Sequence, residues 1–220
     1  MNTRIIKDNR YSDFLAEDLV TAQVNRFKNW KCSAGVEGIF IDWNGNVWPA
    51  TCINDSKYKL GSIYGPEPIL LQKGYLTCLR DTCPCLVEIY LPKYKDTSNQ
   101  LTEIEHSQID LLNFDAVTRA HSSDIGKKYI MWAFGRKCNF NCSYCDDVSH
   151  SKDDDNITQE VIDKVITYSD KFRNNTSIIW SFTGGEPTLN DNFLSLITTL
   201  SNKGDSIAVS SNASKSGEYY

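Results

Sequence analysis

The chain has 220 residues, 40% of them hydrophobic and 23% charged, which is enough apolar material for one domain of ordinary size or two small ones. The formal net charge of −5 and the pI near 5.2 argue against general nucleic-acid binding, because no basic field covers the chain. No apolar run reaches about 18 residues, and the N-terminus lacks the apolar core of a secretory signal. We therefore expect a cytoplasmic protein without a membrane span.

The first half of the chain predicts short elements. Residues 12–27 carry apolar side chains at helical spacing and predict a helix. Residues 38–50 alternate apolar and polar side chains around Asn44 and Gly45, which predicts a β-hairpin because Asn-Gly supplies the positive φ angles of a tight turn. The weaker predictions are a short strand over 60–68, a short helix over 67–79, a loop over 92–99 and a connector with some helix over 101–123.

The second half predicts alternating strands and helices. The expected elements are a strand over 127–134, a helix over 158–172 capped by Thr158, a strand over 176–185, a helix over 190–204 capped by Asn190 or Asp191 and ended by Gly204, and a strand over 205–213. Strand, helix, strand, helix and strand at this spacing predict βα units with a parallel sheet.

Eight cysteines form two groups in the sequence. The first group is Cys32, Cys52, Cys78, Cys83 and Cys85, and the second is Cys138, Cys142 and Cys145. A disulfide framework is the simpler interpretation, but it conflicts with the odd number in each group, the tight spacing and the absent secretory signal. In a reducing compartment, clustered cysteines more often bind metal or act in catalysis.

The second group has the spacing C-x3-C-x2-C, which aims three thiols from one loop at one point. A structural zinc site needs four protein ligands, and His150 is the candidate for a fourth. An iron–sulfur cube held by three cysteines keeps one iron open for another ligand. Both alternatives predict a metal centre on this loop.

A three-cysteine loop after a strand resembles the signature of the radical S-adenosylmethionine (radical SAM) enzymes, and Tyr144 matches the aromatic position before the third cysteine. The resemblance implies that Cys138, Cys142 and Cys145 hold a [4Fe–4S] cluster whose open iron chelates S-adenosylmethionine. Electron transfer from that cluster then breaks a C–S bond and produces a 5′-deoxyadenosyl radical.

A second motif, "FTGGEP" at residues 182–187, resembles the GGEP motif of the same family, which contacts the amino group of the cofactor. Gly184 and Gly185 allow unusual dihedral angles and a close backbone approach. Glu186 offers an acceptor for an ammonium group, and Pro187 ends the strand. An ordinary strand-to-helix turn is the alternative interpretation of a Gly-Gly pair, but two motifs in order at successive strand ends favour the family.

A third stretch, "VSSNA" at residues 209–213, ends the last predicted strand. Ser210 and Asn212 resemble the strand-end positions with which the family touches the ribose or the carboxylate of the cofactor. A polar strand end without a ligand explains these residues equally well.

The early cysteines resemble the auxiliary iron–sulfur module called twitch or SPASM. The resemblance implies that four of Cys32, Cys52, Cys78, Cys83 and Cys85 hold a second [4Fe–4S] cluster, and zinc is the alternative metal. Cys52, Cys83 and Cys85 are the firmest choices. Two spacings depart from the family: six residues separate Gly45 from Cys52, and the last three cysteines read C-x4-C-x-C. The module also precedes the barrel, whereas in the family it generally follows it; an N-terminal twitch subgroup has this order.

The expected fold is α/β: a partial (β/α) radical SAM barrel with about three βα units, preceded by a small cysteine-rich α+β domain like twitch or SPASM. The expected domains are residues 1–95 for the auxiliary cluster, 96–126 as a connector and 127–220 for the barrel. A complete barrel of this family has more strands, which would follow Tyr220. We therefore expect a piece of a longer protein or a shortened relative.

The expected function is reductive cleavage of S-adenosylmethionine to start radical chemistry. Its implied partners are S-adenosylmethionine and an electron donor such as flavodoxin or ferredoxin. Relatives with auxiliary clusters often modify peptides, so a peptide or protein is a candidate substrate, with carbohydrates and nucleotides as alternatives. A different class of function is a non-catalytic iron–sulfur electron carrier or a zinc-stabilised binding module, which would explain the thiols but not the GGEP turn.

Overall fold

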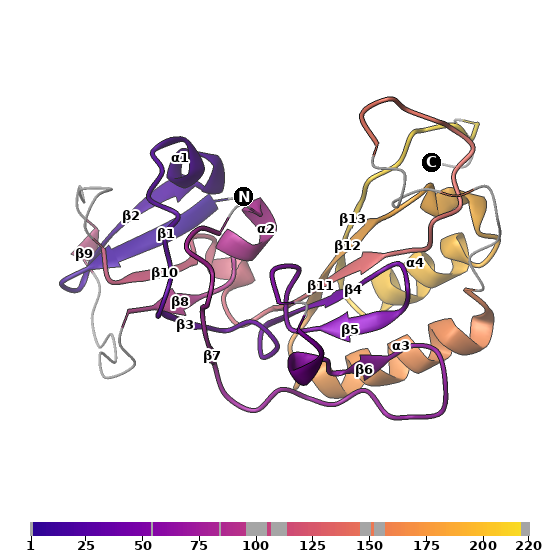
Figure 1. The fold of residues 1–220 in the computed structure, drawn as a ribbon, viewed down its shortest axis with the longest axis horizontal. Helices are drawn as coiled ribbons and strands as arrows, with labels where there is room; N and C mark the ends of the chain where they lie inside the picture. Colours follow the sequence, from indigo (N-terminus) through magenta and orange to yellow (C-terminus); the bar gives the residue numbers. More distant parts are fainter. Residues whose placement is uncertain are drawn as a thin grey trace. The chain divides into compact units, whose positions relative to one another are not determined.

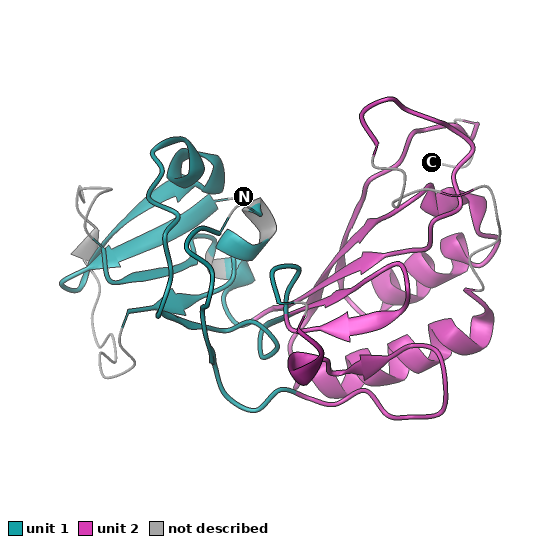
Figure 2. Cartoon of the chain, in the orientation of Figure 1, with its two compact units in different colours: residues 1–38, 50–54, 72–126 teal, residues 39–49, 55–71, 127–220 magenta. Residues whose placement is uncertain are grey.

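The computed structural model describes residues 2–53, 55–83, 85–95, 105–106, 114–145, 151 and 157–216. The chain forms two compact units (Figure 2). The first, which we call the cysteine-rich unit, comprises Met1–Gly38, Ala50–Asn54 and Gln72–Gly126, and the second, the parallel-sheet unit, comprises Ile39–Pro49, Asp55–Leu71 and Lys127–Tyr220. None of the described helices is both long and apolar enough to cross a membrane.

A seven-stranded sheet in the order β7-β3-β8-β10-β1-β2-β9 organises the cysteine-rich unit (Figure 1). Its strands are β1 (Asn2–Lys7), β2 (Arg10–Leu15), β3 (Lys31–Cys32), β7 (Leu76–Thr77), β8 (Lys93–Tyr94), β9 (Glu105–His106) and β10 (Ala116–Arg119). The helices are α1 (Ala16–Thr21), α2 (Leu86–Ile89) and a 3-10 turn at Ser122–Asp124.

The helix predicted over residues 12–27 is wrong at both ends, because only Ala16–Thr21 is helical and Arg10–Leu15 is strand β2. Asp8 and Asn9 both have positive φ, at 49° and 59°, and they reverse the chain so that Lys7 lies opposite Arg10. Strand β2 then pairs antiparallel with β1 along its whole length. Backbone pairing at this two-residue turn overrides the helical spacing, and helix begins only at Ala16.

The helix predicted over residues 67–79 is also wrong. Residues 67–75 form no helix: the Leu70 amide donates to the Leu60 carbonyl (2.7 Å), and Gly74 turns the chain with a φ of 76°. Only Leu76–Thr77 forms a regular element, strand β7. Pairing with a neighbouring segment satisfies the backbone that a helix would have satisfied internally.

Two segments expected to lack strands contribute to the sheet. Lys93–Tyr94, within the predicted loop over 92–99, is strand β8, and Ala116–Arg119, within the predicted connector over 101–123, is strand β10. Strand β10 lies between β8 and β1, so the connector belongs to the core of the unit. Residues 96–104 and 107–113 lie outside the described residues.

An aromatic triad packs the core of the cysteine-rich unit. The ring of Trp30 lies 5.3 Å from that of Phe27 and 5.6 Å from that of Phe114, both edge-on. Ile5, Leu19, Val117 and the Cys83 thiol belong to the same buried cluster. Edge-on aromatic pairs add about 0.5–1.5 kcal/mol beyond their burial, so this triad holds the cysteine-bearing loops against the sheet.

A six-stranded sheet in the order β13-β12-β11-β4-β5-β6 organises the parallel-sheet unit. Its strands are β4 (Gly38–Ile41), β5 (Asn46–Trp48), β6 (Gly61–Ser62), β11 (Lys128–Ala133), β12 (Ile178–Thr183) and β13 (Ser206–Val209). The helices are α3 (Gln159–Arg173), α4 (Phe193–Asn202) and 3-10 turns at Ser56–Tyr58 and Pro187–Leu189. Figure 1 shows α3 and α4 packed along this sheet.

The predicted alternation of strands and helices in the second half is confirmed. Strands β11, β12 and β13 are parallel neighbours, with Trp132 opposite Phe182 and Phe182 opposite Val209. Alternate residues of β12 are buried against the helices, as expected for one face of a strand. Thr158 caps α3 through its hydroxyl, which accepts from the Val161 amide.

The predicted N-cap of the next helix is corrected. Helix α4 begins at Phe193 with Asn192 as its N-cap residue, whereas Asn190 and Asp191 were expected. Asn190 instead accepts the Asn192 amide through Oδ1 (3.0 Å), which forms a local turn before the helix. Gly204, with a φ of 79°, follows the end of α4 as predicted.

The predicted hairpin around Asn44 and Gly45 is confirmed, as β4 and β5. Asp42 organises its turn, because Oδ1 accepts the amides of Asn44 and Asn46 (2.8 and 2.9 Å) and Oδ2 accepts the Trp48 indole N–H (2.8 Å). The hairpin pairs in one sheet with β11. This differs from the expected division, which placed residues 1–95 together.

Asp205 joins α3 to two strands from a fully buried position. Its side chain is 0% exposed and forms a two-point ion pair with the Arg173 guanidinium (2.8 and 3.0 Å). The same carboxylate accepts the Ile178 amide and the Trp180 indole N–H (both 2.9 Å). Such a buried, fully bonded charge is costly to leave without its partner.

We predict that Asp205→Asn lowers the free energy of unfolding by about 1.5–3 kcal/mol, because the neutral amide weakens the two-point pair with Arg173 and can place its own N–H donor against the Ile178 or Trp180 N–H. Urea denaturation of the full chain measures the loss. The matched control is Asp170→Asn, since Asp170 pairs with Lys203 and Arg173 from a half-exposed position and should cost only about 0–1 kcal/mol. Equal losses in the two variants would contradict this prediction.

Candidate functional site

Three sequence motifs follow the ends of three adjacent parallel strands. Strand β11 ends at Ala133 before the cysteine loop, β12 ends at Thr183 before the Gly-Gly-Glu-Pro turn, and β13 ends at Val209 before Ser210. The carboxyl ends of parallel neighbours lie at one edge of a sheet, where ligands and catalytic groups collect. This edge is the candidate site.

The cysteine loop is held by backbone hydrogen bonds. The Cys138 amide donates to the Ser151 carbonyl (2.8 Å), and the Ser151 amide donates back to the Arg136 carbonyl (2.5 Å). The Cys145 amide donates to the Cys142 carbonyl (3.0 Å), which forms a turn that carries the last two thiols. All three thiols of this loop are partly exposed, so they are accessible to a cofactor. His150 lies outside the described residues.

The glycine pair allows the turn after β12 to contact the cysteine loop directly. A Cβ on Gly184 would lie 2.5 Å from the Gly135 carbonyl oxygen, and one on Gly185 would lie 2.6 Å from the Arg136 carbonyl oxygen. Gly184 also has a φ of 116°, which side chains rarely adopt. These positions therefore require glycine because two backbones approach each other.

Backbone hydrogen bonds join the two loops at that contact. The Gly185 amide donates to the Gly135 carbonyl (3.2 Å), and the Glu186 amide donates to the Lys137 carbonyl (2.7 Å). Lys137 immediately precedes Cys138. The position of the first thiol is thus tied to the Gly-Gly-Glu-Pro turn.

The Glu186 carboxylate is buried and joins two strand ends. The residue is 2% exposed, and its carboxylate accepts the amide and the hydroxyl of Thr188 (3.1 and 2.6 Å). It also accepts the Ser211 hydroxyl (3.0 Å) and the Asn212 amide (2.6 Å). The sequence suggested an acceptor for an ammonium group, but four donors from the protein already surround this carboxylate.

Asn212 connects this network to the cysteine loop. Its side-chain amide donates to the Asn139 side-chain oxygen (2.9 Å) and lies 3.8 Å from the Cys138 Sγ, within hydrogen-bonding distance for sulfur. Its backbone amide donates to Glu186. The structure therefore brings Asn212, Glu186 and Cys138 together, as parts of one network across three strand ends.

Sequence reasoning missed three members of this network. Thr188 and Ser211 supply hydroxyl donors to Glu186, and Asn139 accepts from Asn212. In the sequence, these three residues could have been identified only by their position, which is within one or two residues of a motif residue. Short polar side chains are common in turns, so nothing in the sequence set these three apart.

The other predicted site residues have simpler surroundings. Pro187 is buried as the first residue of the 3-10 turn after Glu186. Ser210 is exposed, and its amide donates to the Phe182 carbonyl (2.9 Å). Tyr144 is 88% exposed and Phe140 is 47% exposed, so the cysteine loop presents two aromatic rings to solvent.

The donor set of the loop fits an iron–sulfur cluster with one open iron. Its three thiols lie within eight residues of one loop and are all partly exposed. Among the described residues, no three His, Cys, Asp or Glu side chains are already gathered around a single ion. The ligands of a cube bind separate iron atoms, so they need not share one ion.

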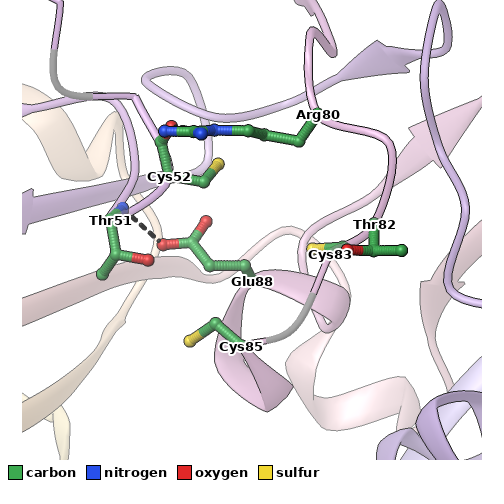
Figure 3. Close-up of a pocket in the computed structure, with 7 residues that line it drawn as sticks. All are labelled: Thr51, Cys52, Arg80, Thr82, Cys83, Cys85 and Glu88. Atoms are coloured by element: carbon green, nitrogen blue, oxygen red, sulfur yellow. Dashed lines mark hydrogen bonds between the residues drawn. The ribbon is translucent and has the colours of Figure 1, made fainter.

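The cysteine-rich unit contains a second group of thiols. A cavity of about 310 Å³ has Cys52, Cys83, Cys85 and Glu88 in its lining. In the view of Figure 3, Glu88 lies between Cys52 and Cys85. Glu88 is buried, and its carboxylate accepts the Thr51 amide (2.8 Å). Cys32 and Cys78 do not line this cavity.

Burial dominates the electrostatics of these thiols. Burial raises the pKa of Cys52 to about 12, and it also raises the pKa values of Cys32 and Cys83. The charge of Glu88 raises all three pKa values further, whereas the charge of Lys93 lowers them. Burial also raises the pKa of the Glu88 carboxyl. Metal binding would require these buried thiols to lose their protons.

A comparison with protein families finds a match in the second half of the chain. Residues 132–219 match the family model of the Radical SAM superfamily, and this match contains the three strand ends and their motifs. No curated protein and no solved structure matches the chain. The match supports a radical SAM-type function, in a family that generally binds a [4Fe–4S] cluster and S-adenosylmethionine.

We predict that Gly184→Ala destabilises the protein more than Gly204→Ala does. Both glycines have positive φ, but nothing lies within 4 Å of a Cβ on Gly204. Gly204→Ala should cost about 1 kcal/mol of backbone strain, and overpacking should add about 1–3 kcal/mol at Gly184. Urea unfolding of both variants checks the difference, and equal losses would show that the contact with Gly135 can relax.

Proposed function

We propose that this chain is a radical SAM enzyme that cleaves S-adenosylmethionine reductively to start radical chemistry. The observation that carries the proposal is the network at the three strand ends, in which Asn212 contacts both Glu186 and Cys138. This network lies within the residues that match the Radical SAM superfamily. A lone cysteine loop would not require such links to a Gly-Gly-Glu-Pro turn.

Cys138, Cys142 and Cys145 would hold the catalytic [4Fe–4S] cluster. When bound, the cluster supplies the electron for cleavage of S-adenosylmethionine. The residues of this chain orient and protect the reacting groups. The Asn212 amide, close to the Cys138 Sγ, would donate to the ligating sulfur, and such hydrogen bonds tune cluster potentials.

The Gly-Gly-Glu-Pro turn would seat the amino group of S-adenosylmethionine through its backbone. Because the Glu186 carboxylate is buried among four donors, we propose that Glu186 is a positioning residue. It would keep the turn and the Asn212 segment at a constant separation. Ser210 and Asn212 would then lie on the ribose or carboxylate side of the cofactor, and Tyr144 beside it.

The cysteine-rich unit would hold an auxiliary centre, with a [4Fe–4S] cluster as the first choice and zinc as the alternative. Its support is the cavity lined by Cys52, Cys83 and Cys85, of which Cys83 is buried and the other two are partly exposed. A flavodoxin or a ferredoxin would donate the electron. A peptide or protein is the proposed substrate class, since relatives with auxiliary clusters often act on peptides.

We predict that anaerobically reconstituted protein produces 5′-deoxyadenosine from S-adenosylmethionine and dithionite, and that Cys142→Ala abolishes the product. Liquid chromatography with mass detection measures the product. The control is Asp163→Asn, because the Asp163 side chain is exposed on α3 and should not affect cleavage. An electron carrier or a zinc module would give no product with the unaltered chain, which would refute the enzyme assignment.

We predict that Glu186→Gln weakens S-adenosylmethionine binding at least about tenfold, because the amide places a donor against existing donors and disorders the turn. Calorimetric titration of the reconstituted protein measures the affinity. Glu160→Gln, in the first turn of α3, is the matched control. An unchanged affinity in the Glu186 variant, with the cluster loaded, would exclude the positioning role.

A further inference from the structure

The side chain of Asn212 is held in one orientation by its own segment. Its Oδ1 accepts the Ser214 amide (3.0 Å), which forms the turn that asparagine side chains make with the backbone two residues on. Ala213, between them, has a φ of 54°, and its amide donates to the Ser211 hydroxyl (3.0 Å). A backbone amide can only donate, so the atom that faces Ser214 is the oxygen, and the side-chain nitrogen faces away from this turn.

The Asn212 nitrogen faces two acceptors on the cysteine loop. Its Nδ2 lies 2.9 Å from the Asn139 Oδ1 and 3.8 Å from the Cys138 Sγ. A primary amide has two N–H donors, so one can serve the oxygen while the other serves the sulfur. The bond to Asn139 fixes the plane of the amide and thereby directs the second N–H at the sulfur. The Phe140 amide, 3.5 Å from the same sulfur, is a further donor.

Other hydrogen bonds hold the main chain on each side of this asparagine pair. The Asn212 amide donates to the buried Glu186 carboxylate (2.6 Å), and the Cys138 amide donates to the Ser151 carbonyl (2.8 Å). The bond between the two asparagine side chains is therefore an addition to a contact that the backbone already makes. Asn139 is exposed, so a change at its side chain should alter the donor at the sulfur and leave the strand ends folded.

We propose that Asn139 is a positioning residue that holds the Asn212 amide on the Cys138 sulfur, and that the two asparagines together raise the reduction potential of the cluster bound there. Reduction adds negative charge to the cluster and its sulfurs, and N–H donors stabilise that charge. This inference rests on the proposed function in taking Cys138 as a cluster ligand. It adds the direction of the redox effect and a residue whose side chain acts on the sulfur only through Asn212.

The reduction potential is measured on the full, anaerobically reconstituted chain, by redox titration followed with electron paramagnetic resonance. The signal that disappears in Cys142→Ala identifies this cluster. Asn212→Leu keeps nearly the same shape but has no donor, and we expect it to disfavour the reduced form about threefold to tenfold, which is roughly 30–60 mV more negative for one electron. Asn139→Ala should shift the potential in the same direction, by no more than Asn212→Leu does. An unchanged potential in both variants would overturn the proposal.

The double variant tests whether Asn139 acts through Asn212. If it does, the two changes are not additive, because the second removes a support whose donor is already lost. Asn139→Ala in the Asn212→Leu background should then leave the potential where Asn212→Leu alone placed it. A further shift, as large as the one that Asn139→Ala causes by itself, would show that Asn139 affects the cluster independently and would refute the positioning role.

Asn190→Leu is the matched control, because Asn190 forms the same kind of turn before α4. Its Oδ1 accepts the Asn192 amide (3.0 Å), and its Nδ2 donates to the Ile157 carbonyl (3.1 Å), so its side-chain donor faces an oxygen and not a sulfur. This change should leave the potential of the cluster unchanged. A shift as large as that of Asn212→Leu would mean that loss of any such turn moves the potential, which contradicts a specific donor at Cys138.

The chain without a cluster tests the geometry of the pair directly, including the case in which Asn212→Leu fails to fold. Nuclear magnetic resonance follows the exchange of the Asn212 side-chain amide hydrogens with solvent. Asn139→Ala removes one of their acceptors, so we expect this exchange to become about threefold to tenfold faster. Equal exchange rates in the parent chain and the variant would show that Asn139 does not hold the amide.

These measurements separate the role of the asparagines from the enzyme assignment. A parent chain that loads no cluster at Cys138, Cys142 and Cys145 refutes the proposed function, and this inference with it. A parent chain that loads the cluster and cleaves S-adenosylmethionine, with a potential that neither asparagine variant changes, refutes only the redox role of Asn139 and Asn212.

Discussion

The buried Glu186 carboxylate is the interaction on which the candidate site depends. It accepts two hydrogen bonds from Thr188, in its own turn, and two from the segment that follows β13. A carboxylate at 2% exposure has lost its water, so it needs all of these donors. The separation between two neighbouring strand ends is therefore held by one charged group, and Asn212 extends that constraint to Cys138.

The glycine pair imposes a complementary constraint at the neighbouring strand end. Hydrogen bonds between backbones draw the turn of Gly184 and Gly185 against the loop that leads to Cys138. A side chain at either glycine would collide with carbonyl oxygens of that loop. Close approach of backbones and burial of a carboxylate together give this edge of the sheet a defined geometry. A cofactor that binds there would meet positions set by the protein itself.

Charge balance is the corresponding constraint in the cysteine-rich unit. This unit is small, and the described part of its core combines an aromatic triad with the buried Lys93 and two buried thiols, Cys32 and Cys83. Neutral thiols would be ordinary core groups, but they would leave the Lys93 ammonium with main-chain carbonyls as its hydrogen-bond partners. Burial raises the pKa of the neighbouring Glu88 carboxyl and the charge of Lys93 lowers it, so these two buried groups interact electrostatically.

Periodicity predicted the second half of the fold well, because its strands and helices are long enough for their buried faces to repeat. It failed where pairing between strands overrides the local spacing of apolar residues. The strand of residues 10–15 depends on the Asp8–Asn9 turn, and β10 depends on neighbours more than 20 residues away in sequence, from β8 to β1. Their pairing partners, rather than a clear alternation of apolar and polar residues within each segment, define these strands.

The sequence by itself determined the parallel βα order, the three-cysteine loop and the Gly-Gly-Glu-Pro turn, because each depends on residue types at fixed local spacing. Only the tertiary structure decided what those residues contact. In the structure, the Glu186 carboxylate is buried, the glycine pair contacts the backbone of the cysteine loop, and Lys93 pairs opposite Cys32. Such contacts join residues far apart in the chain, and hydrogen bonding and burial select them only when the whole sheet forms.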